Sequence, residues 1–313
     1  MTPLASERTS LLVEASRLYY EHGLSQERIA RKLGVSRPTV SRLLKTARDE
    51  GIVQIEIFDP LDRGTQIEDQ LKEKFQLHKV VVVPNDNEED FIIKRRLGQS
   101  AVNLLDQLVV EGTTLGISWG TTMQEVASKV RKRAVNDMTV VQLNGGISRA
   151  EYDTHASEIS KKLGENYGAI PFLLPLPAVV DSPELKEAII SDRNINRTLE
   201  LARKAEIGMF TVGSFGYDSV LVKADYFEPD EVDFLLNQGA VGDICSRIIT
   251  HDGQICSSEL DARTIGIELE DLKKKPHSIA VAGGTEKLQA IRGALKGKWF
   301  NSLVTDEWVA NEL

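Results

Sequence analysis

The sequence has few cysteines and no long apolar run. Only Cys245 and Cys256 occur among its 313 residues, and neither belongs to a C-x-x-C pair or lies beside a cluster of histidines. The sequence therefore predicts neither a disulfide framework nor a zinc site. No apolar stretch approaches the roughly 20 residues that a membrane span needs, and Met1–Arg17 lacks the continuous apolar core of a signal peptide. These absences predict a cytoplasmic protein with reduced thiols.

Acidic residues are missing from one stretch of a chain that is acidic as a whole. The formal net charge is −9, which would repel nucleic acid if it were spread evenly. From Arg28 to Arg48, however, every ionisable residue is Arg or Lys. The overall composition, with 41% hydrophobic and 27% charged residues, is typical of a globular protein. A length of 313 residues corresponds to roughly two domains.

The basic stretch coincides with a predicted helix-turn-helix. Leu11–Gly23 has the apolar spacing of an amphipathic helix, and Ser25 is a good N-cap for a short second helix that ends at Gly34. Ser36 caps a third helix with Pro38 in its first turn, where a missing N–H costs little. Two short helices with small residues at their contact are what a helix-turn-helix requires.

The third helix carries candidate DNA contacts on the face opposite its apolar stripe. Residues early in a recognition helix reach base edges, whereas basic residues further along contact phosphates. The alternative is a solvated helical hairpin whose basic residues only keep it soluble, but the coincidence of charge, caps, turn and stripe favours DNA binding. The predicted DNA contacts are Arg37, Thr39, Ser41, Arg42 and Lys45.

The pattern changes twice between the third helix and residue 76. Ile52, Val53, Ile55 and Ile57 suit one strand of a winged helix. Residues 62–76 are polar with a narrow apolar stripe and predict a linker helix. We place the boundary near residues 59–62, which gives a DNA-binding domain over residues 1–60 and an effector-binding and oligomerisation domain over residues 61–313.

Beyond Lys79, short apolar runs alternate with helical patterns, which indicates parallel β-α units. The expected architecture is an α/β domain with a doubly wound parallel sheet and helices on both faces. Residues 243–265 break this rhythm and predict an inserted hairpin of Ile248–Thr250 and Gln254–Ser257. The predicted strands are Val80–Val83, Thr114–Ser118, Met138–Leu143, Pro171–Pro175, Ile207–Val212, Ser278–Ala282 and Leu303–Thr305. The predicted helices include Ile93–Leu108, Thr122–Arg131, Ala156–Tyr167 and Lys287–Leu295.

Loops that follow four of these runs, together with one acidic residue of the irregular segment, carry candidate ligand contacts. Parallel sheets bind ligands at the carboxyl ends of their strands, where helix N-termini attract anions. Lys287 stands near a helix start and could neutralise a phosphate, and Asp243 could accept hydrogen bonds from sugar hydroxyls. Each signal alone is weak, because glycines after strands are usually plain turns. The predicted contacts are Gly120, Thr121, Thr122, Asn144, Gly145, Asp243, Gly283, Gly284 and Lys287.

Six segments spread over nearly the whole chain carry a resemblance to a known family. They are Ala15–Asp59, Gly116–Thr122 (GISWGTT), Val140–Ser148 (VVQLNGGIS), Ala240–Ser246 (AVGDICS), Asp261–Gly266 (DARTIG) and Val281–Lys287 (VAGGTEK). By these segments the sequence resembles the SorC family of sugar-binding transcriptional regulators, and within it the branch of deoxyribonucleoside regulators. The resemblance implies an effector domain similar in fold to sugar-phosphate isomerases and glucosamine-phosphate deaminases, a homo-tetramer built as a dimer of dimers, and a DNA affinity that changes when a phosphorylated sugar binds.

The resemblance also implies roles for individual residues. By similarity, Gly120–Thr122 and Lys287 hold the phosphate, while Asn144 and Asp243 face the sugar. In the deoxyribonucleoside branch a lysine is expected at the position of Asn144, where it would form a Schiff base with an aldehyde effector. An amide cannot do that chemistry. Either the effector is bound without a covalent link, or it is a different sugar or polyol phosphate.

Three functions fit these patterns. The first is a repressor released from operator DNA by a phosphorylated sugar, and the second is an activator with the same two domains. The third is a sugar-phosphate isomerase or deaminase with an attached DNA-binding module, which would need a positioned general base. Asp243 is the one candidate base, and no histidine accompanies it at a strand end, so a regulator is favoured over an enzyme. No loop has the spacing of a nucleotide-binding motif, and we expect no cofactor and no metal.

Overall fold

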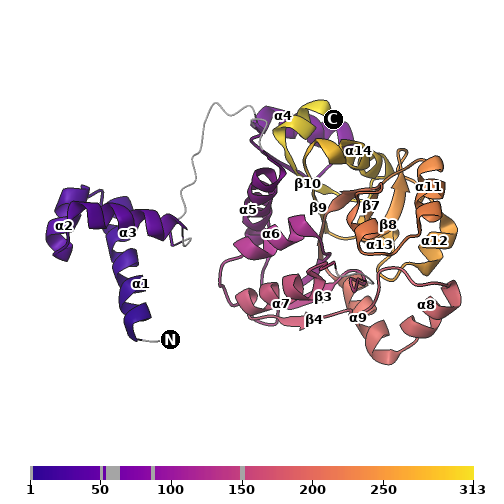
Figure 1. Ribbon diagram of the computed structural model, residues 1–313, viewed down its shortest axis with the longest axis horizontal. Coiled ribbons are helices and arrows are strands. Elements are labelled where there is room, and N and C mark those ends of the chain that lie inside the picture. The colour runs from indigo at the N-terminus through magenta and orange to yellow at the C-terminus, as the bar shows by residue number, and fades with distance from the viewer. Residues whose placement is uncertain (1–2, 50–51, 54–63, 86–88, 149–151) are drawn as a thin grey trace. The chain divides into compact units, whose positions relative to one another are not determined.

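The computed structural model describes residues 3–49, 52–53, 64–85, 89–148 and 152–313. The chain divides into two compact units, Met1–Asp62 and Arg63–Leu313 (Figure 1). The predicted domain boundary and the predicted wing strand beyond Val53 fall on residues 54–63, outside the described residues. In the described ranges, no helix is long and apolar enough to cross a membrane.

The first unit is a cluster of helices around a small core. Helix α1 (Pro3–Ser16) continues as a π-helical turn (Arg17–Glu21), and α2 (Gln26–Leu33) and α3 (Arg37–Asp49) follow. The helices bury one apolar face each, which is what amphipathic spacing requires. The buried core residues are Ala15, Leu18, Ile29, Ala30, Val40 and Leu44.

The ends of α2 and α3 lie where the capping residues predict them. The Ser25 hydroxyl accepts a hydrogen bond from the Arg28 N–H at 3.4 Å, and Gly34 ends α2 with a φ of +69°. The Ser36 hydroxyl accepts from the Thr39 N–H at 3.3 Å at the start of α3. The predicted helix-turn-helix elements are confirmed by these caps.

The second unit is built on a parallel sheet, as predicted. Among the described residues this sheet has seven strands, and every neighbouring pair is parallel. Each predicted apolar run contributes a strand to it. In spatial order the strands are β1 (Lys79–Val83), β10 (Ser302–Asp306), β9 (His277–Val281), β5 (Ile207–Phe210), β2 (Thr114–Ile117), β3 (Thr139–Gln142) and β4 (Ile170–Phe172).

Helices cover both faces of this sheet (Figure 1). Successive strand residues point to opposite faces, so Ile279 belongs to one core and Ala280 to the other. One core receives α5 (Asp90–Leu108), α6 (Thr121–Lys129) and α7 (Ala156–Tyr167). The other receives α4 (Gly64–Phe75), α9 (Arg193–Lys204), α13 (Leu269–Lys273), α14 (Leu288–Gly297) and α15 (Glu307–Glu312). The predicted linker helix is thus α4, and it packs within the second unit.

A small antiparallel sheet lies beside the parallel one and corrects one predicted strand. In the described part of the chain it consists of β6 (Val212–Ser214), β7 (Ala240–Ile244) and β8 (Arg247–Thr250). The run Ile207–Val212 is therefore not a single strand. It divides at Thr211, because the residues before Thr211 pair in the parallel sheet and those after it pair with β7.

The predicted hairpin is confirmed only in part. Ile248–Thr250 lies in β8, as expected, but its main partner is β7, which offers a ladder along the whole strand. Gln254–Ser257 contributes only an isolated bridge between Ile255 and Ile249. The sequence also did not predict α8 (Pro183–Ile190), α10 (Val220–Lys223), α11 (Pro229–Asn237) or α12 (Ser258–Arg263).

Candidate functional site

The candidate DNA surface is the exposed face of α2 and α3. Arg37, Ser41, Arg42 and Lys45 are exposed, whereas Thr39 is half-buried and its hydroxyl shares a 2.8 Å hydrogen bond with the hydroxyl of Ser36. An exposed cluster of cations attracts the phosphate backbone of DNA. The exposed basic residues on the two helices are Arg28, Arg31, Lys32, Arg37, Arg42, Lys45 and Arg48.

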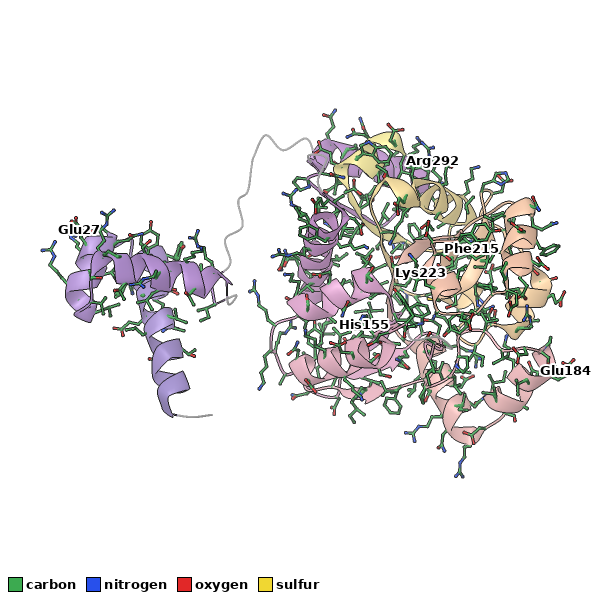
Figure 2. The ribbon with its side chains drawn as sticks, viewed as in Figure 1. Glu27, His155, Glu184, Phe215, Lys223 and Arg292 are labelled. Atoms are coloured by element: carbon green, nitrogen blue, oxygen red, sulfur yellow. The ribbon has the colours of Figure 1, made fainter. Side chains whose placement is uncertain are left out.

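The second unit holds a cavity of about 340 Å³ at the carboxyl ends of the parallel strands. Its wall comes from segments far apart in the chain, including the first turn of α5, the loops after β2, β3 and β9, and the segment from β6 to Lys223, which is labelled in Figure 2. Such a crevice is the usual ligand site of open α/β sheets. Among the predicted contacts, those that line it are Gly120, Thr121, Thr122, Asn144, Asp243 and Lys287.

One end of the cavity is suited to an anion. Gly120 precedes α6 with a φ of +119°, and no side chain caps this helix start, so its first N–H groups are open to an anion. The Lys287 ammonium lies 3.4 Å from the hydroxyl of Thr122 and 3.3 Å from that of Thr211, and donates hydrogen bonds to both. A helix N-terminus, two hydroxyls and a cation thus converge on one point, which is chemistry that binds phosphate.

The charge of Lys287 is poorly compensated in the ligand-free cavity. Burial lowers the pKa of Lys287 to about 8, and the nearby Lys94 acts in the same direction. Asp90 and Asp243 oppose this shift without cancelling it. Lys287 therefore remains mostly protonated at pH 7, and an entering anion would supply the countercharge that it lacks.

The part of the cavity wall around Asn144 and Asp243, here called the hydroxyl end, presents hydrogen-bond acceptors. Asn144 is only 2% exposed, and its Nδ2 donates to the hydroxyl of Ser246 at 2.9 Å, while its Oδ1 has no partner among the described residues. Asp243 Oδ2 accepts from the Ser246 N–H at 3.0 Å, and burial raises the pKa of Asp243 to about 6. A buried acceptor without a partner costs about 1–3 kcal/mol. A ligand hydroxyl would recover that free energy, so this end suits a polyhydroxy compound.

Three predicted contacts, Gly145, Gly283 and Gly284, do not line the cavity, and the first two are packed closely against other parts of the chain. A Cβ on Gly145 would lie 2.3 Å from the carbonyl oxygen of Pro177. A Cβ on Gly283 would lie 2.4 Å from Asp306 Oδ2, and the same oxygen accepts the N–H of Gly284 at 2.6 Å. Gly145 and Gly283 therefore allow close approach of two segments rather than of a ligand, whereas a Cβ on Gly284 would have as its nearest neighbour Asp90 Oδ1 at 3.8 Å.

Several cavity residues were not predicted. Thr211 stands at the division between β5 and β6, inside a run that reads as one strand. Ser246 lies in a tight turn without glycine or asparagine, so no turn signal marked it. Lys287 was expected inside an α-helix but ends a 3₁₀ turn, Thr285–Lys287, that precedes α14. The other unpredicted lining residues include Asp90, Lys94, Tyr152, Ser214, Asp218, Ser219 and Lys223.

A helix-turn-helix unit joined to an α/β unit with such a cavity defines the class of ligand-responsive DNA-binding regulators. Residues 59–313 match the family described as "Putative sugar-binding domain", and residues 8–55 match the "Homeodomain-like domain" family. The chain belongs to the SorC family of sugar-binding transcriptional regulators.

Similar proteins extend over the whole chain. The sequence is 40% identical to the deoxyribonucleoside regulator of Bacillus subtilis (strain 168), and the alignment covers 98% of each chain. It is 30% identical to the sorbitol operon regulator of Klebsiella pneumoniae, again over 98% of each. The crystal structure of that full-length regulator superposes with a TM-score of 0.81, covering 97% of this chain and 98% of the other. The predicted family and fold class are confirmed, and the chain is a DNA-binding transcriptional regulator rather than an enzyme.

Proposed function

We propose that this regulator is a repressor that leaves its operator when a phosphorylated sugar or polyol binds in the cavity. The observation that carries the proposal is the pairing of two kinds of chemistry in one crevice. Lys287 and the start of α6 form an anion site, and Asn144 and Asp243 offer acceptors to hydroxyl groups. A phosphorylated sugar carries both groups that this arrangement requires.

Binding is non-covalent in this proposal. The side chain at the hydroxyl end is the amide of Asn144, which cannot form a Schiff base with an aldehyde. Affinity then depends on hydrogen bonds and charge, and the complex forms and dissociates without a chemical step. Dilution of the ligand should therefore restore operator binding, with no imine to be trapped by borohydride.

The experiment is a titration of operator binding with a ligand panel. The names of the two relatives mention a deoxyribonucleoside and sorbitol. The panel therefore contains 2-deoxyribose 5-phosphate and sorbitol 6-phosphate, together with their unphosphorylated forms and inorganic phosphate. The phosphorylated member that binds should lower operator affinity about 5–150-fold, the usual range of coupling between two sites, and should raise the melting temperature. If neither these compounds nor other pentose, hexose or polyol phosphates change operator affinity, the proposal is wrong.

We further propose that the regulator works in the cytoplasm as a homo-tetramer, a dimer of dimers. Pairs of helix-turn-helix units would then read half-sites one helical turn, about 34–36 Å, apart. Light scattering should give a mass near four times that of the 34.7 kDa chain. A promoter fusion in cells lacking the gene should be expressed constitutively, whereas loss of expression would identify an activator.

A further inference from the structure

The turn between β7 and β8 holds an unfavourable backbone beside the cavity. Its two residues, Cys245 and Ser246, have φ values of +50° and +70°. Two-residue hairpins of this kind favour Asn-Gly, because positive φ is costly for residues with a Cβ. Both residues line the cavity. Such a conformation persists only where its surroundings hold it in place.

Ser246 connects this turn to both acceptors at the hydroxyl end. Its N–H donates to Asp243 Oδ2 at 3.0 Å, and its hydroxyl accepts from Asn144 Nδ2 at 2.9 Å. Because the amide nitrogen of Asn144 is used in this way, its Oδ1 is the atom left for a ligand hydroxyl. The position of Ser246 therefore decides where both acceptors point.

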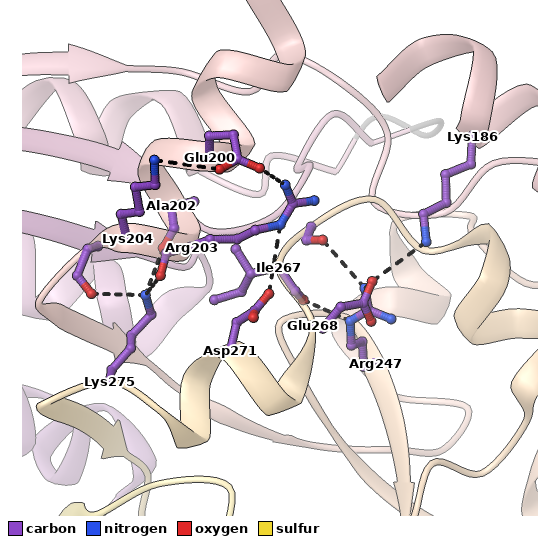
Figure 3. Close-up of polar contacts among 12 residues, drawn as sticks. Lys186, Glu200, Ala202, Arg203, Lys204, Arg247, Ile267, Glu268, Asp271 and Lys275 are labelled. Atoms are coloured by element: carbon purple, nitrogen blue, oxygen red, sulfur yellow. Dashed lines mark hydrogen bonds and ion pairs between the residues drawn. The ribbon is translucent and has the colours of Figure 1, made fainter. Parts of the chain in front are cut away.

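The next residue, Arg247, is the anchor of the turn. It is 1% exposed, and its guanidinium donates to the carbonyl oxygen of Ile267 at 2.9 Å (Figure 3). It also forms ion pairs with Asp261 and, at 2.9 Å, with Glu268. The planar guanidinium thus has partners along the whole segment from Asp261 to Glu268.

That segment returns to Asn144 from the other side. A β-bridge joins Asn144 to Gly266, and the Ile267 N–H donates to the carbonyl oxygen of Leu143 at 2.9 Å. The Gly145 N–H donates to the carbonyl oxygen of Ile265 at 3.0 Å. Asn144 is therefore fixed twice: Ser246 holds its side chain, and the segment bonded to Arg247 holds its backbone.

We propose that Arg247 is a positioning residue for sugar recognition, which keeps the Cys245–Ser246 turn and the segment Asp261–Glu268 around Asn144. This inference rests on the proposed function. It also predicts a separation within the cavity, because the hydrogen bonds described at the anion end involve Lys287 and not Arg247. Arg247 should therefore control affinity for the sugar part of a ligand and not affinity for phosphate.

The first test compares Arg247→Lys with Arg203→Lys. Arg203 is a suitable control, since it is also an ion-paired arginine, contacting Glu200 at 2.6 Å and Asp271 at 3.8 Å, and among the described contacts it has no bond to the turn or to the segment Asp261–Glu268. Calorimetry would use inorganic phosphate, 2-deoxyribose 5-phosphate and sorbitol 6-phosphate. R247K should lower the affinity for the sugar phosphate that the wild type binds by at least tenfold, and the affinity for inorganic phosphate by less than twofold. Parallel losses for both probes, or the same loss in R203K, would overturn the positioning role.

A second test needs no ligand, so it separates this inference from the proposed function. Hydrogen exchange in R247K should rise in peptides containing Gly145, Ser246 and Ile267, because the N–H groups of these residues form the hydrogen bonds around Asn144 and the turn. Exchange should not rise in α6. Unchanged protection of those peptides would refute the inference. If exchange rises in these peptides but the wild type binds no sugar phosphate, the proposed function is wrong and the positioning role of Arg247 is supported.

Ser246→Ala provides a milder variant in the same pathway, because it removes one hydroxyl and leaves the contacts of Arg247 intact. It should show the same selective loss for sugar phosphate. In the S246A background, R247K should lower the affinity by a smaller factor than it does in the wild type, since both changes release the side chain of Asn144 and only the contacts to its backbone are left for R247K to disturb. Additive losses would mean that Arg247 does not act through Ser246.

Discussion

Replacing Lys287 by methionine should stabilise the ligand-free regulator while impairing its response. Burial lowers the pKa of Lys287 from 10.5 to about 8, so carrying the charge at neutral pH costs about 3 kcal/mol of folding free energy. The hydrogen bonds to Thr122 and Thr211 return about 1 kcal/mol each. Methionine fills a similar volume without a charge, so the net gain should be about 1 kcal/mol.

The same substitution removes the cation from the anion site. A charge-assisted hydrogen bond to phosphate contributes about 1.5–3 kcal/mol, so affinity for a phosphorylated sugar should fall roughly 10- to 150-fold. Affinity for the unphosphorylated sugar should not change. Release from the operator would then need a correspondingly higher ligand concentration.

Calorimetric melting and titration measure both effects in one set of samples. Without ligand, K287M should melt about 2–4 °C above the wild type. Lys296→Met, an exposed change in α14, the helix that follows Lys287, should leave the melting temperature unchanged. Between about pH 8 and 10.5 the unfolded wild type binds more protons than the folded form, so its stability rises and the advantage of K287M shrinks. A variant that melts below the wild type, or binds phosphorylated sugar equally well, would refute this reasoning.

Three other substitutions test different parts of the molecule. Asp306→Ala removes a buried side chain that accepts four hydrogen bonds from described residues. Urea titration should therefore show a loss of about 3–5 kcal/mol in the free energy of unfolding, against less than about 0.5 kcal/mol for the exposed Asp252→Ala. Arg42→Ala should reduce the salt slope of operator binding by roughly 0.9, unlike Lys132→Ala in the second unit; equal slopes would remove Arg42 from the DNA surface. Asp243→Asn should gain about 2–3 kcal/mol of stability relative to the wild type between pH 4 and 6, because the raised pKa makes the folded wild type lose stability as its carboxyl ionises. A difference in melting temperature between the two proteins that does not vary with pH would contradict this.

The parallel sheet could be predicted because strands buried on both faces appear as continuous apolar runs, such as Val80–Val83. A run does not say which strand it pairs with, however. Ile207–Val212 reads as one strand and serves two sheets, since the change of partner at Thr211 depends on the position of β7. Helix α8 was missed because it has no buried residue and therefore little apolar periodicity.

The cavity residues that could be predicted are those in loops at the carboxyl ends of predicted strands. That rule found Gly120, Asn144 and Lys287, all of which line the cavity. It could not separate a glycine that faces a ligand from one that packs, as Gly283 does against a carboxylate, because the two differ only in their tertiary neighbours. Ser246 could not be predicted for a related reason: its residue type gives no sign of a positive φ, and the contacts of the neighbouring Arg247 are with residues far along the chain.

The helix-turn-helix and the cavity are completed at different times as the chain leaves the ribosome. The helices that read DNA end at Asp49, whereas the glycine loop before Lys287 is held by Asp306 in the last strand. At about 5–20 residues per second, roughly 15–50 s pass between these points. Under the proposed function, a nascent chain therefore completes its DNA-binding helices well before its sugar-binding cavity, and loss of the final strand would leave a DNA-binding unit that the ligand does not control.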